Sequence, residues 1–167
     1  MYKTFRPKLY LPKNYIAKLA DTFGIALILC SIGFIIINWS ALPNEVPTHF
    51  NFEGVADGWG SKYQMLLLPV ISIVIYIMME VIERKPHTHN YPDRLNEKNV
   101  ANFYKVSQQL VNYTKNISML LFTYISVRSV LMALGKAEGL SIIPFFSIVA
   151  LLLIILVICI VKMKKIT

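Results

Sequence analysis

Four long blocks of apolar residues, separated by polar stretches, dominate the chain. They cover residues 20–39, 64–82, 116–134 and 140–161. About 20 apolar residues are needed to cross the hydrocarbon layer as a helix, because each helical residue adds about 1.5 Å. The blocks are continuous rather than alternating, which favours helices over the strands of a membrane β-barrel. The pattern predicts an all-α integral membrane protein, a four-helix transmembrane bundle formed as a single domain by residues 1–167.

The basic residues are distributed unevenly among the segments that flank these blocks. Fourteen lie before the first block, in the loop 83–115 or in the C-terminal tail, and only Lys62 and Lys136 lie in the other two loops. Cytoplasmic segments of membrane proteins carry an excess of lysine and arginine. We therefore expect a multi-pass protein of the cell membrane with both termini and residues 83–115 in the cytoplasm. The five basic residues before the first block are Lys3, Arg6, Lys8, Lys13 and Lys18.

Composition supports the membrane assignment. Of the 167 residues, 56% are hydrophobic and 16% are charged, whereas soluble domains average about 45–50% apolar and about 25% charged residues. The net charge of +8 is explained by an anionic inner leaflet as the partner of the basic segments. The basic residues are scattered around the apolar blocks, so we expect no nucleic-acid binding.

The outer loop, residues 40–63, has the composition of a folded segment. Thr48 to Phe52 alternates polar and apolar residues, which predicts a short strand with Phe50 and Phe52 on one face and His49 and Asn51 on the other. Glycines at 54, 58 and 60 indicate turns, and Ser61 with Gln64 forms a capping-box pattern for the next helix. We expect Phe50, Phe52 and Trp59 to cap the helix bundle at the membrane interface.

The same loop carries candidate metal ligands. His49, Glu45, Glu53 and Asp57 are residue types that suit zinc or manganese. Their spacing matches no known metal-site template, and structural zinc sites usually need four ligands. We therefore expect these groups to hydrogen-bond the turns of the loop, with no metal and no cofactor bound.

The motif of this loop resembles a bacterial membrane domain of unknown function that also forms the first half of SdpI-type toxin-immunity proteins. The residues that carry the resemblance are Leu42-Pro43, Val46-Pro47-Thr48-His49-Phe50-Asn51, Gly54, Asp57-Gly58-Trp59-Gly60-Ser61-Lys62 and Pro69, followed by Pro86-His87, Asn90-Tyr91-Pro92, Asn99 and Tyr104. The second group resembles the cytoplasmic loop of short four-span relatives. The resemblance implies candidate ligand or signal residues at His49, Phe50, Asn51, Gly54, Asp57, Trp59 and Lys62. It also implies protection against a secreted toxic peptide, although SdpI-type proteins carry further spans after this module.

Polar residues inside the predicted spans are candidates for function, because they are costly in lipid. Ser72, Tyr76 and Glu80 form one stripe of the second helix, with Glu80 near enough to the inner end to reach the headgroups. Arg128, with Tyr124 one turn earlier, lies on the third helix about 9 Å short of its outer end. For Arg128 we expect an ion pair with Asp57 or Glu53 of the outer loop.

Two further patterns concern packing. Asp21, Gly24, Ser31 and Asn38 share one stripe of the first helix, which favours a helix–helix contact. Apolar residues at steps of three and four predict an amphipathic helix over about 96–115, which either lies on the inner leaflet or extends the third span. In both arrangements the lysines of this helix, Lys98, Lys105 and Lys115, fit lipid headgroups.

No motif of a nucleophile elbow, phosphate-binding loop or zinc protease occurs in the sequence. We therefore expect a non-enzymatic membrane protein that confers immunity against a membrane-active peptide or senses envelope stress. Its expected partners are a peptide toxin outside or a regulator in the cytoplasm. The alternatives are a small transporter or channel subunit and, least favoured, a metal-dependent enzyme on the outer face.

Overall fold

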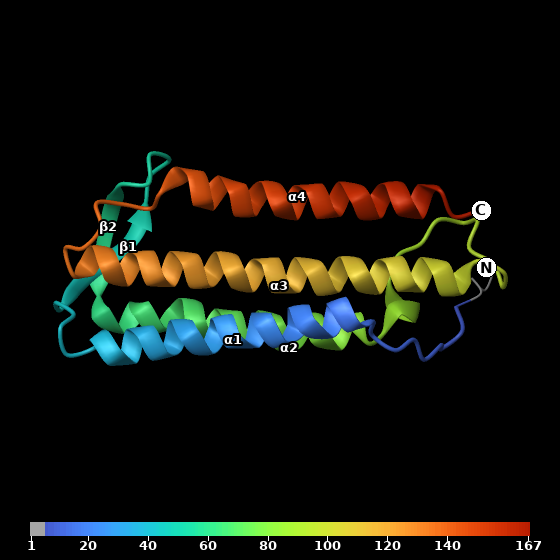
Figure 1. Ribbon diagram of the computed structural model, residues 1–167, viewed down its shortest axis with the longest axis horizontal. Helices are drawn as coiled ribbons and strands as arrows, with labels where there is room; N and C mark the ends of the chain where they lie inside the picture. Colours follow the sequence, from blue (N-terminus) through green and yellow to red (C-terminus); the bar gives the residue numbers. More distant parts are fainter. Residues whose placement is uncertain (1–5) are drawn as a thin grey trace.

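The computed structural model describes residues 6–167 (Figure 1), so Lys3 lies outside the described residues. Two short 3-10 helices, η1 (Lys62–Leu66) and η2 (Pro86–Thr88), flank the second long helix. The other elements, in chain order, are α1 (Tyr15–Asn38), β1 (Glu45–Phe50), β2 (Ala56–Ser61), α2 (Leu67–Glu83), α3 (Val100–Ala133) and α4 (Ile142–Lys164).

Four helical segments of the described chain are long and apolar enough to cross a membrane. The longest is α3, with 34 residues in one uninterrupted helix. At about 1.5 Å per residue α3 is about 51 Å long, which exceeds the hydrocarbon thickness of about 30 Å. The amphipathic segment predicted over 96–115 is therefore the first part of α3 rather than a separate surface helix.

The four helices do not form a closed bundle. In Figure 1, α1 and α2 lie on one side of α3 and α4 lies on the other. Consistent with this view, α4 packs against α3 and not against α1 or α2. The prediction of a four-helix bundle is therefore wrong in its packing. The physical reason is that α4 is apolar on all sides, so its sequence does not specify a buried face.

The all-α prediction is also wrong in part, because β1 and β2 form a two-stranded antiparallel sheet. The register pairs Glu45 with Ser61 and Phe50 with Ala56, with irregularities between Pro47 and Phe50. This hairpin lies at one end of the molecule, which we call the hairpin end, and the C-terminus lies at the opposite end, the terminal end (Figure 1). The predicted capping box does not form, because the Ser61 side chain makes no capping hydrogen bond.

The main apolar core lies at the hairpin end, where the hairpin covers α1 and α3. It consists of Ile35, Leu42, Val46, Met65 and Val130, all of them buried. In the middle of the molecule, the predicted packing stripe of α1 is buried at Gly24 and Ser31. A Cβ on Gly24 would overlap the side chain of Asn116, so glycine permits the close approach of α1 to α3.

Candidate functional site: a hairpin cavity and a buried charge cluster

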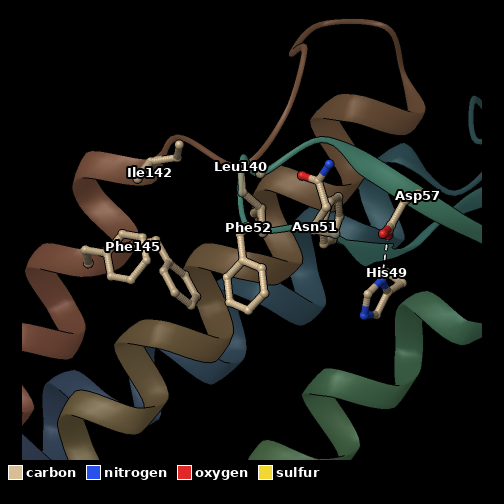
Figure 2. Close-up of a pocket in the computed structure, with 10 residues that line it drawn as sticks. His49, Asn51, Phe52, Asp57, Leu140, Ile142 and Phe145 are labelled. Carbon is tan, nitrogen blue, oxygen red and sulfur yellow. Dashed lines mark hydrogen bonds and ion pairs between the residues drawn. The ribbon is translucent and has the colours of Figure 1, made fainter.

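A cavity of about 430 Å³ lies between the tip of the hairpin and the start of α4; we call it the hairpin cavity (Figure 2). Its apolar wall is largely aromatic and is built from both segments. Its polar residues come from the hairpin alone. The residues that matter for the argument are Phe50, Phe52, Phe145 and Phe146 on the apolar side and His49, Asn51 and Asp57 on the polar side.

The His49 and Asp57 side chains form a pair at the polar end of the cavity. Their Nδ1 and Oδ1 atoms are 2.5 Å apart, and the pair is open to solvent, with 73% of the His49 side chain and 45% of the Asp57 side chain exposed. His49 lies in the irregular part of β1 opposite Gly58. A Cβ on Gly58 would stand 2.8 Å from the His49 Cβ, so glycine is needed for this approach. The carboxylate fixes the orientation of the imidazole ring.

The hairpin turn is held by Asn51 and tied to the start of α4. The Asn51 side-chain oxygen accepts hydrogen bonds from the backbone N–H groups of Glu53 and Val55. Gly54 has a positive φ of 78°, and its carbonyl accepts a hydrogen bond of 2.8 Å from the Leu140 N–H. A Cβ on Gly54 would overlap the Leu140 carbonyl oxygen. Two segments far apart in the sequence thus build the cavity together.

Five of the seven outer-loop candidates, His49, Phe50, Asn51, Gly54 and Asp57, line this cavity. The other two lie elsewhere: the Lys62 ammonium is 5.3 Å from the Trp39 ring centroid, and Trp59 does not line the cavity. Phe52 is 97% exposed and Trp59 is 59% exposed. The expectation that these two aromatic residues cap the bundle is therefore wrong, because Phe52 lies beyond the end of β1, in the turn.

Arg128 and Tyr124 both hold the connection between α3 and α4. The Arg128 guanidinium donates a hydrogen bond to the Gly139 carbonyl, and the Tyr124 hydroxyl donates one of 2.8 Å to the Ser141 carbonyl. Within residues 6–167, Arg128 forms no ion pair with Asp57 or Glu53, so the predicted pairing is wrong. Asp57 is instead paired with His49, and the partly buried Arg128 donates to a backbone carbonyl, while its Nε has no partner among residues 6–167.

A second site lies where the start of α1 and the end of α2 meet the middle of α3, and charged side chains from four segments come together there. Three carboxylates come from α1 and α2, and two ammonium groups come from α3 and the segment before α1. We call this the charge cluster; it consists of Lys13, Asp21, Glu80, Glu83 and Lys115.

Lys115 is the centre of the charge cluster. Its Nζ lies 2.8 Å from Asp21, 2.5 Å from Glu80 and 2.8 Å from Glu83, and its side chain is 0% exposed. Lys13 contacts the same three carboxylates, at 2.5, 2.7 and 3.2 Å. Charges can be buried stably only where they are paired in this way.

Two amides of α3 complete the cluster. Asn112, fully buried, donates to Asp21 at 2.8 Å and to Glu83 at 3.1 Å. Asn116 donates to Asp21 at 3.0 Å. The remaining carboxylate lone pairs are thus largely occupied, which buried ion pairs require.

Sequence reasoning missed most of this cluster. Glu80 was singled out, but Lys115 was expected at the lipid headgroups, and that expectation is wrong because the side chain is fully buried. The sequence carries one signal: Lys115 directly precedes the apolar block 116–134, and an ionisable residue at the edge of a membrane span is a candidate for an internal counter-ion.

The carboxylates of the charge cluster, and not those of the hairpin, lie close enough together to resemble a metal site. Within residues 6–167, Asp21, Glu80 and Glu83 are the one group of three ligand-type residues whose oxygens lie within 4.8 Å of one another. The Lys115 ammonium bonds all three, so it already acts as their cation. Of the acidic residues proposed around His49, only Asp57 contacts it.

The segment between α2 and α3 is ordered by aromatic packing. Tyr91 packs against Phe103 and Tyr104, with ring centroids 5.9 and 5.2 Å apart, and its hydroxyl donates to the Pro86 carbonyl. Burial raises the pKa of Tyr91 to about 12. At the end of α2, a hydrogen bond to Glu80 raises the pKa of Arg84 above its ordinary value.

The remaining loop candidates have structural roles or are exposed. Asn99 is buried before the first turn of α3, and its side chain bonds the backbone of residues 94 and 96. Asn90 and Pro92 are exposed, and His87 is partly exposed. These positions are not brought together with the hairpin cavity, because they lie at the other end of the molecule.

One comparison with known proteins covers the hairpin and the adjoining parts of α1 and α2. A family model described as "Domain of unknown function (DUF1648)" matches residues 26–73. An uncharacterized protein of Archaeoglobus fulgidus is 34% identical over 65 residues; the match covers 34% of this chain and spans 36% of that relative. No solved structure matches. The matched family region ends before Glu80 and begins after Asp21, so it contains the hairpin and lies outside the charge cluster.

Proposed function

We propose that this chain is a non-enzymatic protein of the cell membrane that binds membrane-active peptides at the hairpin cavity and thereby protects its own cell. The observation that carries the proposal is the cavity itself: four phenylalanines face a polar end with an exposed carboxylate. Membrane-active peptides combine aromatic and aliphatic side chains with lysine and arginine. An aromatic side chain of such a peptide would fill the apolar part, and a neighbouring basic side chain would pair with Asp57.

The position of the hairpin supports this proposal. Both the hairpin and the start of α4 follow directly on helices that are apolar enough to span a membrane. A peptide that inserts into the membrane interface would meet the cavity at the ends of these helices. In the proposed orientation this is the outer face, with both termini in the cytoplasm, and the resemblance to SdpI-type immunity proteins points to the same role.

The test compares the survival of bacteria exposed to a panel of membrane-active peptides. A deletion strain should be more sensitive than its parent to at least one peptide, and the wild-type gene should restore resistance. Phe145→Ala should fail to restore it, because it removes an aromatic wall of the cavity. Phe23→Ala is the matched control, since Phe23 lies on α1, is 57% exposed and does not line the cavity.

Expression of each variant in the membrane fraction is measured in parallel. Equal sensitivity of the deletion strain and its parent across the panel contradicts the immunity role. Equal protection by Phe145→Ala and wild type contradicts the assignment of the site.

Movement of a small ion is a second candidate, favoured by the charge cluster alone. Ionisable residues within membrane spans often mark ion pathways. On α3, however, the fully buried Met119 lies one turn from Lys115 toward the hairpin end. An ion path that leaves the charge cluster in this direction would therefore meet an apolar side chain. Ion flux through proteoliposomes, with Lys115→Met as the variant, distinguishes this role from a purely structural one.

A further inference from the structure

A second cavity, of about 460 Å³, lies beneath the hairpin and on the membrane side of it; we call it the lateral cavity. Its walls are the start of α2, the last third of α3 and the start of α4. The apolar side chains that matter are Leu67 and Leu68 from α2, Ile125 from α3 and Phe145 from α4. It shares four lining residues with the hairpin cavity, His49 and Phe50 of β1 and Leu140 and Phe145 at the start of α4, so the two cavities lie on either side of these segments.

The arrangement of the helices opens this cavity toward the side of the molecule. Because α4 packs against α3 and not against α2, no helix covers the face of α3 between them (Figure 1). Leu67, on the rim, is 58% exposed. In a membrane, an opening at this position is reached from the lipid rather than from water.

One hydroxyl in the lateral cavity lacks an acceptor. Ser126 is 3% exposed, and its Oγ has no hydrogen-bond partner among residues 6–167. Two other buried serines of the spans donate to a carbonyl of their own helix, Ser31 to Ile28 and Ser72 to Leu68. A buried hydroxyl without a partner is unfavourable, so a molecule in the cavity should supply the acceptor.

The depth of Ser126 indicates what that molecule is. Ser126 lies seven residues before the end of α3, which places it about 10 Å inside the helix end. The hydrocarbon layer is about 30 Å thick within a bilayer of about 40–45 Å, so the polar layers are each about 5–8 Å deep. With the end of α3 at the outer edge of the bilayer, Ser126 would lie near the boundary where the acyl ester carbonyls of phospholipids lie.

The lining of the lateral cavity changes from polar to apolar along its length, as a phospholipid does from headgroup to acyl chain. Thr48, His49 and Gln64 line it on the hairpin side, and apolar side chains line it further in. A single water molecule would satisfy the Ser126 hydroxyl but would leave the apolar walls unfilled. A phospholipid offers a polar headgroup, an ester acceptor and an acyl chain in this order.

We propose that the lateral cavity binds one phospholipid from the leaflet at the hairpin end. One acyl chain lies against Leu68, Ile125 and Phe145, and an ester carbonyl accepts the hydrogen bond from Ser126. The headgroup lies beside His49 and Gln64. This inference does not depend on peptide binding at the hairpin cavity, because it rests on the Ser126 hydroxyl and on the position of α4.

The test is native mass spectrometry of the chain purified from nanodiscs of phosphatidylethanolamine and phosphatidylglycerol. The wild-type chain should retain one phospholipid after the nanodisc is removed. Ser126→Ala keeps the volume of the cavity but removes the hydrogen bond, and it should lower the retained fraction about fivefold. Ser126→Leu fills the cavity and should abolish retention.

Ser118→Ala and Ser118→Leu are the matched controls, because Ser118 lies on the same helix and its hydroxyl donates to the Thr114 carbonyl. Both should retain lipid as the wild type does. A wild-type chain that carries no lipid overturns the proposal, and so does an equal loss in the Ser118 and Ser126 variants.

Thermal unfolding identifies a variant that fails to fold, and Ser126→Ala then decides the question alone. A photoreactive acyl chain provides an independent measurement. Its crosslinks should concentrate on Leu67, Leu68 and Ile125, and crosslinks spread evenly over the lipid-facing side chains of α1 and α4 would contradict a defined site.

Discussion

Replacement of Lys115 by methionine should be among the most destabilising single changes in this chain. Methionine is close to lysine in length and in helix propensity, so the change removes the charge with little effect on packing volume. Lys115 is fully buried and lies within 2.8 Å of three carboxylates. Without it, the basic partners of these carboxylates among residues 6–167 are Lys13 and, for Glu80, the exposed Arg84.

The magnitude can be estimated from the distances. At about 2.7 Å and an effective dielectric constant of about 20, one ion pair contributes about 6 kcal/mol before desolvation is counted. Desolvation offsets much of this, and removal of one partner from a buried ion pair costs about 3–5 kcal/mol in measured cases. We expect Lys115→Met to lower the free energy of unfolding by that amount.

The assay is unfolding of the purified protein in mixed micelles by a denaturing detergent, followed by circular dichroism. Lys105→Met is the matched control, because Lys105 is exposed on the same helix and its loss should change stability by no more than about 0.5 kcal/mol. Glu83→Gln in the Lys115→Met background should recover about 2 kcal/mol, since it removes one uncompensated carboxylate. Equal stability of the two lysine variants would refute the conclusion that the cluster is shielded from water.

Three further predictions concern the hairpin and the terminal end. Gly54→Ala should destabilise the protein by about 1–2 kcal/mol, because Gly54 has a positive φ and a Cβ there would overlap the Leu140 carbonyl in the α3–α4 connection. Gly33→Ala is the control and should not destabilise it, because the space around Gly33 is open; thermal unfolding measures both variants. Membrane orientation can be tested in a background in which both cysteines, Cys30 and Cys159, are replaced by serine. In intact cells, Phe52→Cys should react with a membrane-impermeant maleimide and Lys98→Cys should not. The reverse result would show that the proposed orientation is inverted. Stability should fall as the pH rises from about 10 to about 12, because Tyr91 ionises first in the unfolded chain, and Tyr91→Phe should reduce this loss in unfolding measured across that range.

The helices and the first strand of the hairpin could be anticipated because their signals are local. Each apolar block is long enough to span a membrane by itself, and α1, α2, α3 and α4 each overlap most of one predicted block. Alternation around His49 indicated a strand and Gly54 a turn, and the hairpin has both. The turns predicted at Gly58 and Gly60 are wrong, because these residues lie in β2 and pair with β1. The group of His49, Asn51 and Asp57 is likewise local, because the hairpin brings residues less than ten positions apart together.

The charge cluster, the lateral cavity and the place of α4 required the folded chain. Lys115 pairs with Asp21 and Glu80 because three helices bring these residues to the same depth and turn their side chains toward one another. The residue spacing within one helix specifies neither the relative depth nor the relative rotation of two helices. For α4 the reason is different. A helix that is apolar on all sides is equally compatible with lipid and with protein. The position of α4 therefore depends on van der Waals contact with α3 and on contacts at its start, such as the hydrogen bond from the Leu140 N–H to the Gly54 carbonyl.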